Sequence, residues 1–256
     1  DRDRPSHIVT PIIHKDRGQI AAALQRELGC AYTEDPRAMT AIARAHLRGI
    51  FRRADIGITG VNFAIAETGA ICICTNEGNG RMSTTRPRIH VALCGIEKLI
   101  PRTRDLAPFL KLLARSSTGQ PLTVYTNLIC GPRRPTDADG PEALHIILLD
   151  NGRSRILDGP LREVLRCIRC GACLNACPVY RSIGGHAYGG VYPGPIGAGL
   201  TPLPDGLDAH HPLPRASSLC GACRDACPVR IDQPRHVGAL RTVTRDGQPL
   251  AKRLGL

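Results

Sequence analysis

Apolar positions recur at helical spacing near the start of the chain. From Met39 to Phe51, apolar or weakly polar residues return every three or four positions, while Arg44, Arg48 and Arg52 lie on the opposite side. This period predicts a surface helix with one buried side.

Two more helices are predicted from capping residues. One extends from Gly18 to Leu28, with Asp16 as its N-cap and Gly29 as its stop. The other covers about Leu106–Arg115, with Asp105 as a cap.

Five short apolar runs separate these helices. They are rich in Ile, Val and Leu and do not alternate with polar residues, which predicts strands covered on both faces. The runs are Ile56–Thr59, Ala70–Thr75, Ile89–Leu93, Leu122–Asn127 and His145–Asp150. Helices interleaved with buried strands predict an α/β layered domain over residues 1–157.

The remainder, residues 158–256, has a different character. A short helix is predicted near Leu161–Arg166, directly before a cysteine-rich segment. Residues 181–214 contain eight Gly and six Pro, which predicts a long irregular connection without regular elements, ending in His210 and His211.

Length and composition bound the class of protein. A chain of 256 residues with 42% hydrophobic content is long enough for a sizeable core and two domains. No stretch approaches the ~20 apolar residues of a membrane span, and no secretory signal is visible. The chain opens with Asp1 rather than Met, so we expect a processed product or a fragment.

The formal charge of +12 raises the question of nucleic acid as a partner. Aromatic residues make up only 3% of the chain, Trp is absent and the arginines are scattered, which argues against such binding. A solvated basic surface, or a dock for an acidic redox partner, is the preferred interpretation.

Seven of the twelve cysteines lie between residues 167 and 227 at spacings of two and three. The first four form the C-x2-C-x2-C-x3-C-P signature of bacterial-type ferredoxins: Cys167, Cys170, Cys173 and Cys177, followed by Pro178. Three thiolates on one curling loop can reach three irons of a cubane, while the fourth points to a neighbouring cluster. This crowding indicates iron–sulfur chemistry in a reducing cytoplasm rather than secreted disulfides.

A second copy of the motif has one thiol fewer. Its cysteines are Cys220, Cys223 and Cys227, and Ser217 stands where the first copy has Cys167. We predict two [4Fe–4S] clusters, each held by cysteines from both copies of the motif. The first would be held by Cys167, Cys170, Cys173 and Cys227, and the second by Cys177, Cys220 and Cys223.

The second cluster lacks a fourth thiol from its motifs. Its fourth iron could be bound by the Ser217 oxygen or by another cysteine, could carry solvent, or could be lost to leave a [3Fe–4S] centre. We therefore expect the second cluster to be the labile one. Zinc is the alternative metal, but four cysteines before Pro178 favour iron.

The other five cysteines are interpreted as small hydrophobes in strands or at element ends, without a catalytic role. They are Cys30, Cys72, Cys74, Cys94 and Cys130. Three histidines beside apolar runs are interpreted as core or surface residues rather than ligands: His14, His90 and His145.

Residues 57–81 bring polar side chains to expected strand ends. Ligands gather at such ends in α/β sheets, which predicts a small-molecule pocket; a set of turns with capping side chains is the alternative. The candidate pocket residues are Asn62, Glu67, Thr68, Asn76, Asn79 and Arg81. Neither GxGxxG nor GxxxxGK[ST] occurs, so the simplest nucleotide sites are excluded.

Segments from both halves, in this order, resemble the family of the bacterial lactate-utilisation iron–sulfur protein B (LutB). They are GITGVNFAIAETG, NEGNGRM, DNGRS, CIRCGACLNACPVYR, GGHAYGGVYPGPIG and SSLCGACRDACPV. The resemblance implies a LUD domain of the NagB/RpiA/CoA-transferase-like α/β fold over residues 1–157. It implies an α-helical ferredoxin-type two-cluster domain after it, and family members that extend further at both ends.

The resemblance also implies a role in oxidising L-lactate to pyruvate. The chain would be one component of a cytoplasmic system, beside the Cys-rich lactate-utilisation protein A and a second LUD protein, lactate-utilisation protein C. Such oxidation removes two electrons and a cluster normally passes one, so we expect this chain to relay electrons to an acceptor. Two alternatives stay open: an enzyme with its own pocket around Glu67 and Asn79, and a nucleic-acid-binding iron–sulfur regulator.

Overall fold

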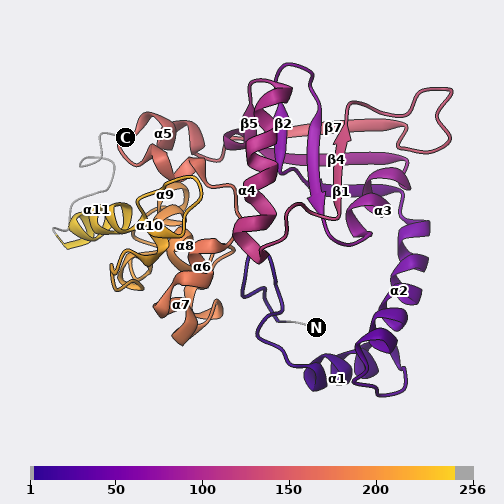
Figure 1. Cartoon of the computed structure of the whole chain (residues 1–256), viewed down its shortest axis with the longest axis horizontal. Coiled ribbons are helices and arrows are strands. Elements are labelled where there is room, and N and C mark those ends of the chain that lie inside the picture. Colours follow the sequence, from indigo (N-terminus) through magenta and orange to yellow (C-terminus); the bar gives the residue numbers. More distant parts are fainter. Residues whose placement is uncertain (1–2, 246–256) are drawn as a thin grey trace. The chain divides into compact units, whose positions relative to one another are not determined.

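The computed structural model describes residues 3–245 and divides into two compact units (Figure 1). Unit 1 contains Asp3 and residues 14–106 and 123–149. Unit 2 contains residues 4–13, 107–122 and 150–245. Each unit is therefore assembled from segments that are far apart in the sequence.

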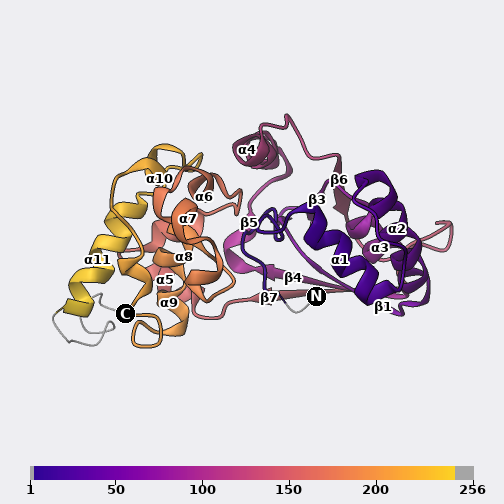
Figure 2. The ribbon, with the colours of Figure 1, turned by 90° about the horizontal axis from the view of Figure 1, so that it is seen from below.

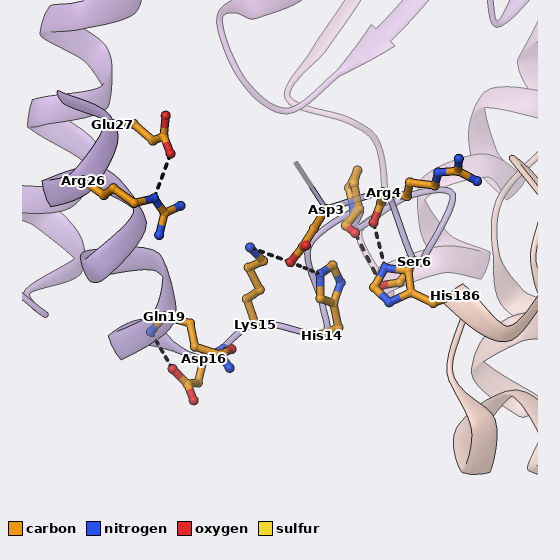
Figure 3. A network of polar contacts seen from close by, with 11 residues as sticks. Asp3, Arg4, Ser6, His14, Lys15, Asp16, Gln19, Arg26, Glu27 and His186 are labelled. Carbon is orange, nitrogen blue, oxygen red and sulfur yellow. Dashed lines mark hydrogen bonds and ion pairs between the residues drawn. The ribbon is translucent and has the colours of Figure 1, made fainter. Parts of the chain in front are cut away.

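Unit 1 begins with two capped helices, α1 (Arg17–Leu28) and α2 (Pro36–Arg53). The Asp16 carboxylate accepts the Gln19 N–H at 2.8 Å, and the Gln19 side chain accepts the Asp16 N–H at 3.0 Å (Figure 3). This reciprocal cap, with Gly29 in the left-handed region at φ 64°, confirms the predicted ends of α1.

The predicted buried side of α2 is confirmed only in part: Ile42, Ala43 and Phe51 are partly buried. Met39 is buried, but Leu47 and Ile50 each keep 46% of their surface exposed. Apolar spacing shows which side of a helix favours contact; whether another element covers that side depends on the rest of the fold.

Unit 1 contains two sheets and a short helix, α3 (Asn79–Thr85). The first sheet is parallel, in the order β1 (Ile56–Gly60), β4 (Ile89–Gly95), β7 (Ala143–Leu149). The second is mixed, in the order β5 (Leu99–Ile100), β2 (Phe63–Ile65), β3 (Ile71–Thr75), β6 (Tyr125–Ile129). Both β2 and β5 are short strands that the apolar runs did not predict, and β6 starts later than expected.

The core of unit 1 lies between strands of both sheets and contains Val61, Ala64, Ile71, Ile73, Ala92 and Cys94. The prediction that the apolar strands are covered on both faces is wrong for the outer strands. Ile58 is 64% exposed and Leu148 is 53% exposed. A continuous apolar run fits a buried strand but cannot itself supply the layer that would bury it.

Unit 2 is helical. Its helices are α4 (Leu106–Thr118), which begins in unit 1, α5 (Arg153–Asp158), α6 (Ala172–Ala176), α7 (Pro178–Ile183), α8 (Gly194–Leu200), α9 (Pro202–Asp205), α10 (Ala222–Asp225) and α11 (Gln233–Arg245). Residues 162–166, predicted as a helix, form a 3-10 helix. Residues 4–13 join this unit: the Tyr180 hydroxyl donates to the Ser6 carbonyl at 2.7 Å, and His186 contacts the Arg4 carbonyl (Figure 3).

The Gly- and Pro-rich segment 181–214 forms regular elements, so the prediction of a long irregular connection is wrong. Helix α8 is buried at every position and contacts α6 and α11 in the middle of the unit (Figure 2). A Cβ on Gly197 would overlap the carbonyl oxygen of Tyr192. Glycine here permits close backbone approach, and burial outweighs its low helix propensity.

Within residues 3–245, no helix is both long and apolar enough to cross a bilayer.

Candidate metal centre

The two cysteine motifs fold as near copies of each other. Arg169 and Leu219 adopt φ values of 65° and 57°, and two residues later Gly171 and Gly221 adopt 81° and 90°. Each glycine precedes a short helix, α6 or α10. Left-handed backbone costs a non-glycine residue about 1–2 kcal/mol. In such backbone, successive N–H groups point to the same side and form a concave anion-binding site, as at many iron–sulfur centres.

Backbone N–H groups point at the sulfurs of both motifs. The Ala172 N–H donates to Cys170 and the Ala222 N–H donates to Cys220. Further along, the Tyr180 N–H lies 3.4 Å from the Cys177 Sγ, and the Ile231 N–H lies 3.4 Å from the Cys227 Sγ. These donors stabilise negative charge on sulfur, whether on a free thiolate or in a cluster.

One group of thiols forms around the first motif. Cys170 and Cys173 both interact electrostatically with Cys167 and with Cys227, which comes from the second motif. Burial raises the pKa of Cys170 to about 11, and burial also raises the pKa of Cys173, with the neighbouring thiols adding to both shifts. The four thiols predicted for the first cluster therefore lie within electrostatic range of one another, although no three of them are close enough to hold a single metal ion.

A second group forms around the second motif. Cys223 interacts with Cys177 from the first motif and with Cys220. Burial raises the pKa of Cys223 to about 11. Cys220 is exposed, and its pKa is lowered by the Ala222 N–H and the Ser218 hydroxyl. These are the three thiols predicted for the second cluster.

The donor set fits iron–sulfur clusters. Buried thiols that crowd one another are costly to ionise without a metal, and coordination to a cation removes the proton outright. Four soft sulfur ligands with N–H donors match the requirements of a [4Fe–4S] cluster. Among residues 3–245, no three His, Cys, Asp or Glu side chains are close enough to hold one metal ion.

An apolar shell surrounds the first group. The buried core of Ile156, Val164, Leu165, Leu174, Ile196 and Leu200 packs against Cys167 and Cys173. The guanidinium of Arg169, which stands between Cys167 and Cys170 in the sequence, lies 4.6 Å from the centre of the Tyr192 ring. Such a shell limits solvent access and thereby tunes the potential of a bound cluster.

Ser217 and Ser218 have different contacts. The Ser217 hydroxyl accepts the Leu219 N–H at 3.1 Å, which supports the left-handed turn. The Ser218 hydroxyl interacts with the Cys220 sulfur. Sequence reasoning selected Ser217 by aligning it with Cys167 and missed Ser218, because a repeat alignment marks ligand positions and not hydrogen-bond donors.

Three of the candidate pocket residues in unit 1 bond to backbone. The side-chain oxygens of Asn62, Thr68 and Asn76 accept the N–H groups of Cys74 at 2.9 Å, Ala70 at 3.3 Å and Val124 at 3.1 Å, respectively. These contacts hold turns and strand ends, as the alternative interpretation of this segment described.

The remaining three candidates have separate contacts. Glu67 accepts the Thr103 N–H and hydroxyl at 2.9 and 3.0 Å, which lowers the pKa of this carboxyl. Asn79 starts α3. Arg81 lies over the Tyr125 ring and lines a pocket of about 400 Å³, whose lining does not include the other five candidates.

The other histidines and cysteines are buried to different degrees, and Cys30 and Cys74 are only partly buried. His90 is fully buried and contacts the Thr59 hydroxyl at 2.7 Å, and His14 lies 3.8 Å from Asp3 (Figure 3). Cys72 and Cys94 are buried, whereas Cys130 is exposed, contrary to the expectation of a small buried hydrophobe. Its place after the end of β6 explains the exposure.

Two family models match successive parts of the chain. The LUD domain model matches residues 2–149, and the 4Fe-4S dicluster domain model matches residues 163–231. A solved DUF162 family protein from Deinococcus radiodurans aligns at a TM-score of 0.29 and 24% identity, over 38% of this chain and 55% of that protein.

Relatives at about half identity match nearly the whole chain. Lactate utilization protein B of Shouchella clausii is 52% identical over 92% of this chain and 49% of the relative. Uncharacterized electron transport protein YkgF of Escherichia coli is 52% identical over 90% and 49%, respectively. Lactate utilization protein B of Bacillus cytotoxicus is 48% identical over 100% and 54%.

The chain spans about half the length of these relatives. The LUD domain model alone covers more than half of the chain. Unit 1, with its sheets and helices, and the helical, cysteine-rich unit 2 follow the order of the two matched models. The chain therefore belongs to the LUD domain family, and it carries a 4Fe-4S dicluster domain after its LUD domain.

Proposed function

We propose that this chain is an electron-transfer component of a cytoplasmic system that oxidises L-lactate to pyruvate. Two relatives are named lactate utilization protein B and one is named an electron transport protein. We further propose two partners, the Cys-rich lactate-utilisation protein A and the LUD-containing lactate-utilisation protein C. The proposal is supported by the duplicated turns at Gly171 and Gly221 and by interactions across the motifs, of Cys227 with Cys170 and Cys173 and of Cys177 with Cys223.

Bound [4Fe–4S] clusters would pass electrons one at a time. The chain's own residues would ligate them, with Cys167, Cys170, Cys173 and Cys227 at the first and Cys177, Cys220 and Cys223 at the second. Backbone N–H groups would stabilise the charge on these sulfurs, and the shell around Leu174 would limit water. We place the division between the LUD domain and the cluster domain near residue 157.

Iron and sulfide counting with EPR after anaerobic purification tests the ligand assignment. Cys227→Ser should alter the spectrum of the cluster held by Cys167, Cys170 and Cys173, although it changes the other motif. Cys177→Ser should alter the second cluster in the same reciprocal way. Cys130→Ser, at an exposed cysteine outside the motifs, is the control and should leave both spectra unchanged. If Cys227→Ser changed only the cluster of Cys220 and Cys223, the assignment would be wrong.

A second experiment tests the relay. With the full-length protein, the clusters should become EPR-detectably reduced on addition of L-lactate only when both proposed partner proteins are present. Reduction by lactate in the isolated protein would instead place substrate oxidation in this chain. No reduction in the complete system would refute the proposed function.

A further inference from the structure

Residues 4–13, here called the N-terminal segment, belong to unit 2 although the LUD domain model includes them. Ser6 and His7 are only 2% and 4% exposed. Ile8 packs against the apolar core that also contacts Cys167 and Cys173 of the first motif. The N-terminal segment is therefore a buried part of the unit that carries the cysteine motifs.

The imidazole of His7 is oriented by its own segment. Its Nδ1 accepts the N–H groups of Val9 at 3.0 Å and Thr10 at 3.1 Å. Because Nδ1 accepts two backbone N–H groups, it carries no proton itself. The ring also lies edge-on to the Tyr180 ring, with 5.9 Å between the ring centres. The imidazole is thus held in one orientation.

This imidazole packs against the turn of the first cysteine motif. A Cβ on Gly171 would lie 3.0 Å from the His7 Cε1 and 3.3 Å from the Val9 Cγ2. Gly171 adopts the left-handed φ of 81°, and the N–H of the next residue, Ala172, donates to Cys170. His7 therefore contacts the turn that directs a backbone donor at a ligand sulfur.

The second motif has the same turn without such a contact. Gly221 adopts a φ of 90°, and the Ala222 N–H donates to Cys220. Among the residues that the structure describes, a Cβ on Gly221 would meet only the Arg224 guanidinium, at 3.7 Å. The turn of the first motif is thus supported by a distant segment, and that of the second is not.

Other contacts hold the N-terminal segment in place without His7. The Tyr180 hydroxyl donates to the Ser6 carbonyl at 2.7 Å, and His186 contacts the Arg4 carbonyl at 2.7 Å (Figure 3). A Cβ on Gly185 would overlap the same Ser6 carbonyl, so the two backbones approach closely there. A substitution at His7 should therefore leave the segment attached.

We propose that His7 is a positioning residue for the first [4Fe–4S] cluster. By packing on Gly171, it holds the turn that points the Ala172 N–H at the Cys170 sulfur. Hydrogen bonds to cluster sulfurs raise the reduction potential, because they stabilise the negative charge that reduction adds. His7 thereby raises the potential of the first cluster and slows its loss. This inference rests on the cluster ligation in the proposed function.

The test begins with His7→Ala in the full-length protein, purified without oxygen. EPR redox titration should show the first cluster at a lower potential than in the wild type, and its signal should decay faster in air. The second cluster should keep its wild-type potential and lifetime. His14→Ala is the control, because His14 lies in unit 1, and it should change neither cluster. An unchanged first cluster, or equal changes in both, would refute the proposal.

Two further variants separate the ring from its acceptor nitrogen. His7→Phe keeps an aromatic ring against Gly171 but cannot accept the Val9 N–H. His7→Asn has a side-chain oxygen that can accept this N–H, but it places no ring on the glycine. We expect His7→Phe to retain most of the wild-type potential and His7→Asn to behave as His7→Ala. The opposite order would show that packing on Gly171 is not the cause.

Hydrogen exchange decides the role of His7 without a cluster signal. In the same preparations, the amides of residues 170–177 should exchange faster in His7→Ala than in the wild type, while those of residues 220–227 should not change. Equal exchange of 170–177 in both proteins would refute the positioning role. Wild-type protein purified without iron would contradict the proposed function instead, and the exchange comparison would still test His7.

Discussion

Among single residues, His236 on α11 combines full burial with an acidic neighbour. Its imidazole Nε2 lies 3.7 Å from the Glu163 carboxylate, which also lies 3.9 Å from Arg166 and from Arg235. Burial lowers the pKa of His236, and Glu163 offsets this effect only in part. The native protein therefore holds this imidazole neutral at a pH where the unfolded chain would protonate it.

This lowered pKa predicts a pH dependence of stability. Below about pH 6.5 the unfolded state binds a proton that the native state does not, so stability is present above that pH and is lost as the pH falls. The free energy of unfolding, measured in urea at about pH 7.5 and about pH 5.5, should fall less in His236→Gln than in the wild type. His211→Gln, at an exposed histidine, is the control and should keep the wild-type slope. Equal slopes for wild type and His236→Gln would contradict the prediction.

At the scale of elements, close packing stabilises α8 although its glycines have a low helix propensity. Three of its seven residues are glycine, yet all seven are buried and Ile196 and Leu200 belong to the core around the first motif. The helix can approach its neighbours closely because its glycines carry no Cβ. Its position in turn supports the Cys173 sulfur, which accepts the Ile196 N–H.

This packing predicts opposite effects of the same substitution in two helices. Gly197→Ala would push a Cβ into the Tyr192 carbonyl and should destabilise unit 2 by about 1–3 kcal/mol. Gly238→Ala in α11 meets no atom within 4 Å and should stabilise by up to about 1 kcal/mol. Urea unfolding of both variants measures the difference, and a neutral Gly197→Ala would show that α8 is not closely packed.

For the whole molecule, the two thiol groups differ in number and in exposure. The first contains four thiols, including buried Cys170, and packs against an apolar core. The second contains three, and one of them, Cys220, is exposed. Solvent and oxidants therefore reach the second group more easily, and in the proposed assignment it would have one cysteine ligand fewer.

We predict that iron is lost in two phases under mild oxidation. The cluster of Cys177, Cys220 and Cys223 should decay first, through a [3Fe–4S] signal, while the other persists. EPR and released iron, followed over the same period in air and without oxygen, measure the order. Parallel loss of both clusters would contradict the expected difference.

Local signals in the sequence determined the parts of this protein that depend on near neighbours. Asp16 and Gly29 specify the ends of α1 because their hydrogen bonds and dihedral angles involve residues within one turn. The repeated cysteine spacing predicted two similar turns, and the duplicated segments fold alike around Gly171 and Gly221 because they have equal length. The ferredoxin-type class followed from the cysteine spacing, whereas the LUD class was implied by the resemblance of whole segments to a known family.

The tertiary structure alone decided which surfaces are covered and which polar residues meet. The apolar faces of β1, β7 and α2 stay partly exposed, while the glycine-rich α8 is buried, because burial depends on elements distant in sequence. Asn62, Thr68 and Asn76 bond to backbone groups rather than converge on a cavity. The strand predicted over Ala70–Thr75 places Cys72 and Cys74 on one face, but the 3.8 Å approach of their sulfurs depends on side-chain orientations that only the folded structure fixes.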